Sequence, residues 1–256
     1  MNWRLRRAIE KNILENSDKI IVLSEFTKKK LRHHHAIGEE KIEIIPGGVD
    51  LVRFSPRGNR TSIRKDLNIP PEKFVLFTVR NLVARMGLEN LLYAVSKVVP
   101  EVPELYLVIG GTGPLEQDLI SLAQELSMNK FVRFVGFIEE EDLPCYYRMA
   151  DLFILPTKEL EGFGLVTLEA LACGIPVLGT PVGGAKEILA KLGRDFLLAD
   201  TGVNTMAASI LRMALKLKGN KDQEEALSRQ CRRFVETYYS WDDKTDLLEE
   251  LFQGLL

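Results

Sequence analysis

The stretch PTKELEGFGLVTLEALACGIP, residues 156–176, indicates both the fold and the place of the expected site. Two glutamates, Glu161 and Glu169, stand eight residues apart in it, and a Gly-Phe-Gly turn follows the first. Glycines let the backbone approach a ligand closely and adopt conformations that a Cβ forbids. Good helix formers come next, so we expect a helix to begin at Gly164 or Leu165. The first N–H groups of a helix lack internal partners and lie at the positive end of its dipole, which suits a phosphate.

The segments on either side of this stretch are typical of buried strands. DLFILP (151–156) comes before the loop, and PVLGT (176–180) follows the helix. The loop would then lie at the carboxyl end of a parallel strand, where open α/β sheets bind ligands. A Gly-rich turn with two solvated glutamates is the alternative for EGFG alone, and the full segment is more specific than that.

Strand and helix patterns alternate from Lys73 onward, which predicts an α/β fold. Strands are predicted at 74–80, 105–110, 131–137, 151–156, 176–180 and 196–200, and helices at 87–99, 114–127, 139–150, 165–173 and 182–190. Right-handed crossovers make this a doubly wound parallel sheet, a Rossmann-like fold with helices on both faces. A helical C-terminal segment is predicted at 205–218 and 222–256.

The first part of the chain predicts a smaller helix and strand unit. A basic amphipathic helix over 1–18 precedes a strand at 19–24, and Ser24 is a good N-cap for a helix that Gly38 would end. A second strand is predicted at 41–46. We expect the basic helix to pack on the sheet with its charged face in water; a peripheral membrane contact is the alternative.

Composition excludes several classes of protein. The 34 basic residues nearly balance the 36 acidic ones, so nothing indicates nucleic-acid binding. The cysteines, Cys145, Cys173 and Cys231, are scattered, odd in number and without metal-ligand spacing, which favours a reduced compartment. No apolar run is long enough to span a membrane. We therefore expect a cytoplasmic protein that could lie at the periphery of a membrane.

The segment from Glu161 to Glu169 resembles the E-x7-E region of retaining nucleotide-sugar glycosyltransferases of family 4, within the glycosyl transferases group 1. These enzymes have the GT-B architecture of two facing Rossmann-like domains. The resemblance implies that Glu161 is catalytic and lies against the donor sugar, and that Glu169 binds the ribose hydroxyls. It also implies that the backbone around four residues contacts the donor diphosphate. They are Phe163, Gly164, Leu165 and Val166.

The loop VRNLVARMG (79–87) departs from the family pattern. The family has an arginine and a lysine on the diphosphate at the positions of Asn81 and Met86, and this chain has Arg80 and Arg85 one residue earlier in each case. We expect Arg85 to contact the diphosphate and act in catalysis, because a side chain on a loop can change its direction more easily than one on a strand. Arg80 is expected to be a further donor-binding residue. Two surface arginines are the alternative.

Two other loops fall at carboxyl ends of predicted strands. GGTGP (110–114) opens a helix as phosphate loops do, which makes Gly111 and Gly113 candidates for donor binding. In the next loop the resemblance assigns Phe137 and Ile138 to the nucleotide base. Residues 139–142 are acidic, and we expect them to form the first turn of a helix rather than a metal site.

The resemblance divides the chain into three parts. Residues 1–54 would be the end of the GT-B N-terminal domain and the hinge, residues 55–236 the nucleotide-sugar-binding domain, and residues 237–256 a helix that packs back on the N-terminal part. Most of the family's N-terminal domain has no counterpart here. We expect either a fragment or internal-start product, or a natural half completed by a partner chain or a homodimer.

The implied reaction is retaining transfer of a hexose from a UDP- or GDP-sugar to a hydroxyl of a glycan or lipid-linked acceptor, with no cofactor and no metal. A diphosphate leaving group needs positive charge and amide dipoles, and an oxocarbenium-like sugar needs a nearby carboxylate. A truncated, non-catalytic nucleotide-sugar-binding half is the alternative. A dinucleotide-dependent oxidoreductase is weakly indicated, because GGTGP does not follow the first strand of the fold.

Overall fold

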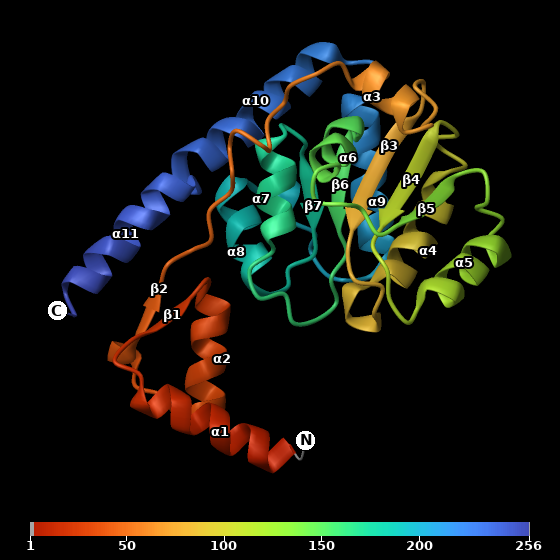
Figure 1. Ribbon diagram of the computed structural model, residues 1–256. Helices are drawn as coiled ribbons and strands as arrows, with labels where there is room; N and C mark the ends of the chain where they lie inside the picture. The colour runs from red at the N-terminus through yellow and green to blue at the C-terminus, as the bar shows by residue number, and fades with distance from the viewer. Residues whose placement is uncertain (1–2, 256) are drawn as a thin grey trace.

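A parallel sheet of five strands forms the centre of the molecule, in the order β5-β4-β3-β6-β7 (Figure 1). The computed structural model describes residues 3–255, apart from the side chain of Arg4. Met1, Asn2 and Leu256, which our predicted domains include, lie outside the described residues. Every pairing within this sheet is parallel, which confirms the doubly wound α/β prediction. The strands are β3 (Phe74–Val79), β4 (Leu105–Gly110), β5 (Val132–Gly136), β6 (Leu152–Leu155) and β7 (Val177–Gly179).

The strand order reverses between β3 and β6. Strands β4 and β5 lie on one side of β3, and β6 and β7 lie on the other. Such a reversal leaves a crevice at the carboxyl ends of the two strands, where open α/β sheets bind ligands. The loops that follow β3 and β6 therefore face a common crevice.

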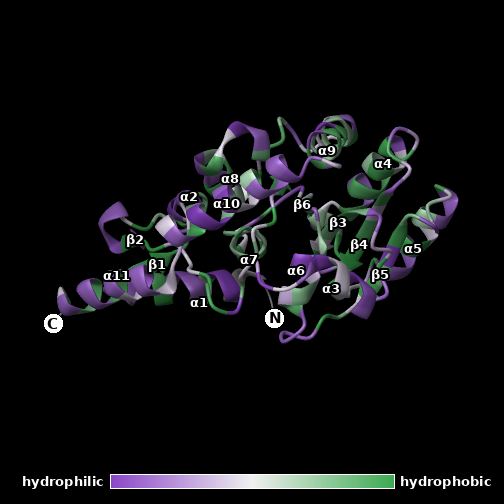
Figure 2. Ribbon diagram, turned by 90° about the horizontal axis from the view of Figure 1, so that it is seen from above, coloured by the Kyte–Doolittle hydropathy of each residue, from purple (hydrophilic) through white to green (hydrophobic). Residues whose placement is uncertain are grey.

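Helices cover both faces of the sheet, and Figure 2 shows the strands between α4 and α9 on one side and α3 and α6 on the other. All of β6 is buried, as expected for a strand covered on both faces. The helices are α3 (Arg60–Asp66), α4 (Leu88–Val98), α5 (Glu116–Glu125), α6 (Leu143–Met149), α7 (Leu165–Ala172), α8 (Gly183–Leu192), α9 (Val203–Leu217), α10 (Lys221–Tyr238) and α11 (Trp241–Gln253), with 3₁₀ turns η1 (Glu39–Lys41), η2 (Ala84–Met86) and η3 (Arg194–Phe196). Within residues 3–255, none of the helices has the length and apolarity needed to cross a bilayer.

A separate two-stranded parallel sheet lies near the N-terminus. Strands β1 (Ile20–Val22) and β2 (Ile42–Ile44) form this sheet. Together with helices α1 (Trp3–Asn16) and α2 (Glu25–His35) they make up the N-terminal unit. The side chain of Ser24 accepts a hydrogen bond from the Thr27 amide and caps α2, as predicted. The prediction that Gly38 ends α2 is wrong: Ala36 takes the left-handed conformation at φ 54°, and its amide bonds back to Arg32.

Three element predictions need correction. The predicted strand at 196–200 is only an isolated bridge between Leu197 and Gly179, because the chain then turns at Asp200, whose carboxylate accepts from the Gly202 amide at 2.7 Å. The helix predicted at 139–150 begins only at Leu143, so the acidic residues lie in the turn before it. The helical segment at 222–256 breaks before Ser240, whose side chain caps a new helix.

The final helix extends beyond α10 and away from the central sheet (Figure 1). Most of its apolar side chains are exposed, among them Trp241, Leu247 and Phe252, whereas Lys244 is buried. Its start is tied to the linker, because Ser240 forms a parallel bridge with Val49. Packing of this helix on residues 1–54 stays a prediction.

Arginines hold the linker between the two sheets through its backbone carbonyls. Arg148 donates to the carbonyls of Ser55 and Arg53 at 2.8 and 2.9 Å. Arg232 donates to those of Phe54 and Leu51 at 2.7 and 3.0 Å. The course of residues 51–55 is therefore set by side chains of α6 and α10.

Helix α3, which we did not predict, inserts a buried arginine at the amino ends of the strands. Arg64 is 5% exposed and donates to the Asp151 carboxylate at 2.6 Å and to the Met149, Pro71 and Lys73 carbonyls. Asp151 also accepts from the Val75 amide of β3 at 2.6 Å. This network joins α3 to the entries of β3 and β6, far in sequence from one another.

We predict that Arg64→Ala lowers the free energy of unfolding by about 3 kcal/mol, because it removes the buried cation beside the Asp151 carboxylate and leaves the Met149, Pro71 and Lys73 carbonyls without this donor. Urea denaturation monitored by circular dichroism measures the change. Arg60→Ala is the matched control: Arg60 also contacts Asp151, but its side chain is 36% exposed. The control should lose less than about 1 kcal/mol, and equal losses would contradict the prediction.

Candidate functional site

A cavity of about 590 Å³ opens at the crevice between the carboxyl ends of β3 and β6. Most of the residues predicted from the sequence line it. They are Arg80, Gly111, Phe137, Ile138, Glu161, Phe163, Gly164, Leu165 and Val166. Gly113, Arg85 and Glu169 are not among its lining residues. Lining residues that we did not predict are Leu23, Val79, Asn81, Met86, Thr112 and Gly162.

Glu161 forms a buried ion pair with Arg80 inside this cavity. The side chains are only 11% and 6% exposed, and the Arg80 Nη2 donates to Glu161 Oε2. The Thr157 hydroxyl donates to the same oxygen at 3.1 Å, and Arg80 Nη2 also lies 3.2 Å from Thr157 Oγ1. Charge-assisted hydrogen bonds of this kind hold a side chain firmly in place. The pair fastens the end of β3 to the loop after β6.

The backbone of Glu161 is held by the start of α8. The Gly184 amide donates to the Glu161 carbonyl at 2.9 Å. Gly183 has φ 61°, and a Cβ there would lie 1.8 Å from the Glu161 carbonyl oxygen. Only glycine allows this approach, so the sequence of α8 fixes the position of the catalytic candidate.

The positive charge of the β3 loop is arranged differently from our expectation. Arg85 donates from Nη1 to the Leu160 carbonyl at 3.1 Å, outside the cavity lining. Asn81 and Met86, where the resemblance has the arginine and lysine, do line the cavity. Arg80 lines it too, but its charge is matched by Glu161. A contact of Arg85 with the diphosphate stays a prediction.

The amino end of α7 faces the cavity. The helix begins at Leu165, as predicted, after Gly164 in the left-handed conformation at φ 87°, and no side chain caps it. The Thr167 amide bonds back to the Gly164 carbonyl at 2.9 Å, which leaves the amides of Leu165 and Val166 as candidates to bind an anion. Gly111 approaches closely from the other side: φ is 107°, and a Cβ would lie 1.9 Å from the Arg80 carbonyl oxygen. Gly113 instead packs on the Leu82 backbone.

Glu169 lies on α7, is not among the lining residues of the cavity, and is half-buried. The Tyr147 hydroxyl donates to its Oε2 at 2.6 Å. Burial raises the pKa of Glu169, while the Tyr147 hydrogen bond and the charge of Arg53 lower it and Glu140 raises it. Tyr147 is fully buried, which holds the pKa of its hydroxyl well above the ordinary value, so it stays a donor. No sequence pattern marks Tyr147, because its partner lies on another helix.

The N-terminal unit reaches the same loop. The Ser24 hydroxyl donates to the Gly162 carbonyl at 2.7 Å. The Glu187 carboxylate of α8 accepts from the Phe26 amide at 2.8 Å and the Glu25 amide at 3.1 Å, at the start of α2. We predicted Ser24 only as a helix cap, and its second contact could not be read from local sequence.

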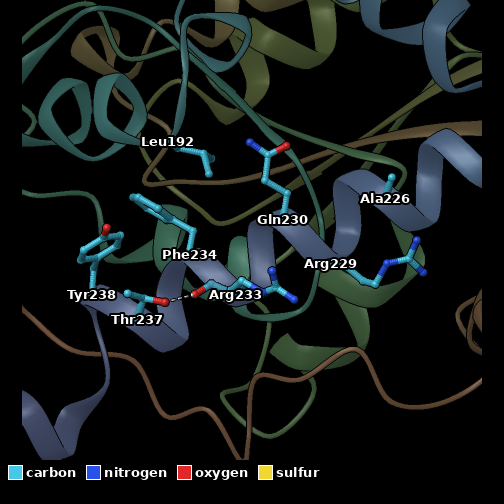
Figure 3. A pocket seen from close by; sticks show the side chains of 8 residues that line it. All are labelled: Leu192, Ala226, Arg229, Gln230, Arg233, Phe234, Thr237 and Tyr238. Carbon is cyan, nitrogen blue, oxygen red and sulfur yellow. Dashed lines mark hydrogen bonds between the residues drawn. The ribbon is translucent and has the colours of Figure 1, made fainter.

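A second cavity of about 500 Å³ lies on α10 and contains none of the predicted site residues (Figure 3). Arg229, Arg233, Phe234 and Tyr238 contribute to its lining, and no carboxylate does. In the described part of the chain, no group of three or more His, Cys, Asp or Glu side chains could hold a metal ion. Of these two cavities, the crevice between β3 and β6 is the one that contains a buried ion pair.

Comparison with protein families gives matches along most of the chain. The family described as glycosyl transferases group 1 matches residues 59–233, and the one described as Glycosyltransferase Family 4 matches residues 1–53. Sucrose-phosphate synthase from Thermosynechococcus elongatus superposes with a TM-score of 0.82 at 30% identity, over 98% of this chain and 62% of that one. These matches agree with the observed α/β fold.

Two curated relatives are similar over nearly the whole chain. The GDP-mannose-dependent alpha-(1-6)-phosphatidylinositol monomannoside mannosyltransferase of Mycobacterium tuberculosis is 27% identical over 97% of this chain and 65% of its own length. The D-inositol 3-phosphate glycosyltransferase of Corynebacterium urealyticum is 30% identical over 98% of this chain and 60% of its own length. The chain thus spans less than two thirds of these relatives. Since the group 1 match covers more than half of the sequence, the chain belongs to the glycosyl transferases group 1 family.

Proposed function

We propose that this chain carries the donor site of a retaining glycosyltransferase that transfers a hexose from a nucleotide-diphosphate sugar to an acceptor hydroxyl. The observation that carries the proposal is the cavity in which the Arg80–Glu161 pair lies beside the uncapped amino end of α7. Family membership supports it, and so do relatives named as GDP-mannose-dependent mannosyltransferase and D-inositol 3-phosphate glycosyltransferase. The donor base is uridine or guanosine in this proposal.

Glu161 would act beside the anomeric carbon. Its negative charge would stabilise the oxocarbenium-like sugar, and Arg80 would keep the carboxylate oriented. The leaving diphosphate gathers negative charge, which the amides at the start of α7 would offset. Arg85 would add a full positive charge if its side chain turned from the Leu160 carbonyl toward the cavity.

The nucleoside would lie across the outer part of the cavity. Phe137 is 67% exposed at its rim, and Ile138 lines it, so both are available to the base. Glu169 would accept hydrogen bonds from the ribose hydroxyls. The reaction proposed uses no metal and no cofactor.

We assign residues 55–236 to the donor domain and residues 1–54 to the facing domain, with 237–256 as the helix that returns to it. The acceptor, a glycan or a lipid-linked glycan, would approach from the side of Leu23, which lines the cavity from the N-terminal unit. A partner chain or a second copy would complete the acceptor side, in the cytoplasm or at the membrane periphery.

Calorimetric titration of UDP, GDP and ADP, with and without attached sugars, tests the donor site. We expect one nucleotide to bind at micromolar strength, and Glu169→Ala to weaken it by at least about 1.4 kcal/mol, a tenfold change. Binding of no nucleotide would contradict the proposal, and tight binding without any turnover would favour a non-catalytic half.

Glu161→Gln should lower donor turnover at least about 100-fold, because the neutral amide cannot stabilise the positive sugar. Affinity for the nucleoside diphosphate alone should change less than about threefold, since Glu161 contacts the sugar in this mechanism. Release of nucleoside diphosphate measures turnover. Glu159→Gln, an exposed glutamate of the same loop, is the matched control. Equal turnover in Glu161→Gln and the control would remove Glu161 from the mechanism.

A further inference from the structure

The ring of Tyr147 is fixed by aromatic side chains from three different elements. Phe77 of β3 and Phe153 of β6 lie 5.5 Å from it between centroids, and Phe54 of the linker lies at 5.9 Å. Edge-on and tilted packing at these distances is favourable for aromatic rings. The ring is fully buried, so its hydroxyl has one position.

That hydroxyl determines where the Glu169 carboxylate lies. The bond from Tyr147 Oη to Glu169 Oε2 is 2.6 Å long, and it is the hydrogen bond that the described residues make to this carboxylate. A carboxylate has two oxygens, each with capacity to accept. Oε2 is engaged by the tyrosine, and Oε1 is left for a ligand.

The charged groups around Glu169 come from several elements. Arg53 of the linker lowers the pKa of Glu169, whereas Glu140 before α6 raises it. Arg53 and Glu140 also pair with each other at 2.9 Å, so the net field of these two groups is small. Cys173 follows on the same helix, and its own pKa is raised to about 12, so it stays neutral. Burial raises the pKa of Glu169, and the Tyr147 hydroxyl is thus the main local contact that lowers this pKa and favours the ionised form.

We infer that Tyr147 is a positioning residue that holds Glu169 ready to accept the ribose hydroxyls of the donor nucleotide. The inference rests on the proposed function, because it needs a nucleotide in this cavity. The ribose hydroxyls are accepted best by the ionised carboxylate, in which neither oxygen carries a proton, held in the right rotamer, and the Tyr147 hydrogen bond favours both conditions. The hydrogen bond between Tyr147 and Glu169 joins α6 to α7. In the proposed function, the loop before α6 contacts the nucleotide base and the amino end of α7 faces the diphosphate.

Tyr147→Phe keeps the ring and removes the hydrogen bond. We expect the dissociation constant of the nucleotide that binds the wild type, UDP or GDP, to rise at least tenfold at pH 8, and more at pH 6. The sign follows because losing the donor raises the pKa of Glu169 further, so protonation then removes the acceptor at a higher pH. Calorimetry gives the constants, and carbon-13 NMR of the Glu169 carboxyl gives its titration midpoint, which should move up.

Tyr146→Phe is the matched control, because Tyr146 packs on the same Phe77 and its hydroxyl has no hydrogen-bond partner among the described residues. It should bind within twofold of the wild type. In the Glu169→Ala background, which has no acceptor for the Tyr147 hydroxyl, Tyr147→Phe should have no further effect on binding, as a double-mutant cycle requires for a shared contact. Equal affinity of Tyr147→Phe and wild type, or additive effects in the cycle, would overturn the inference about Tyr147 and leave the proposed function standing. A wild type that binds no nucleotide would overturn the proposed function and the inference with it.

Discussion

The ion pair of Arg80 and Glu161 joins the two strands between which the sheet reverses its order. Breaking it would leave a largely buried charge without its partner, which is costly for either side chain. The pair therefore requires the end of β3 and the loop after β6 to stay together. The glycine contacts of α8 on the Glu161 backbone and the Ser24 contact on Gly162 build outward from this loop.

Much of the fold could be predicted because its signals are local. The start of α7 at Leu165 follows from two glycines before a run of helix formers, and the sheet follows from buried apolar runs at regular spacing. Helix α3 was missed because it is short and polar, and its anchor, Arg64, finds its partner Asp151 far along the chain. The predicted strand at 196–200 forms only the bridge from Leu197 to Gly179, because the chain turns at Asp200 directly after it.

The residues of the candidate site also fall into those that local sequence indicates and those that only tertiary contacts bring into place. Residues carried by one continuous motif, such as Phe163 and Gly164, line the cavity to which the family resemblance assigned them. Tyr147 and Leu23 reach their places only through tertiary contacts, and nothing in their neighbours indicates a ligand. The register of the β3 loop was the hardest part, because one residue of shift along a strand reverses the side that a charge faces. Both Arg80 and Asn81 nevertheless line the cavity, and Arg80 pairs there with Glu161.

The arginine contacts to the linker have a consequence for how this chain can change in evolution. Arg148 and Arg232 bond to backbone carbonyls, which every amino acid supplies. The path of residues 51–55 is therefore nearly independent of the identity of an exposed residue such as Val52. Substitutions at that position should therefore leave the path of the linker unchanged, whereas replacing either arginine would free the segment that connects the two sheets.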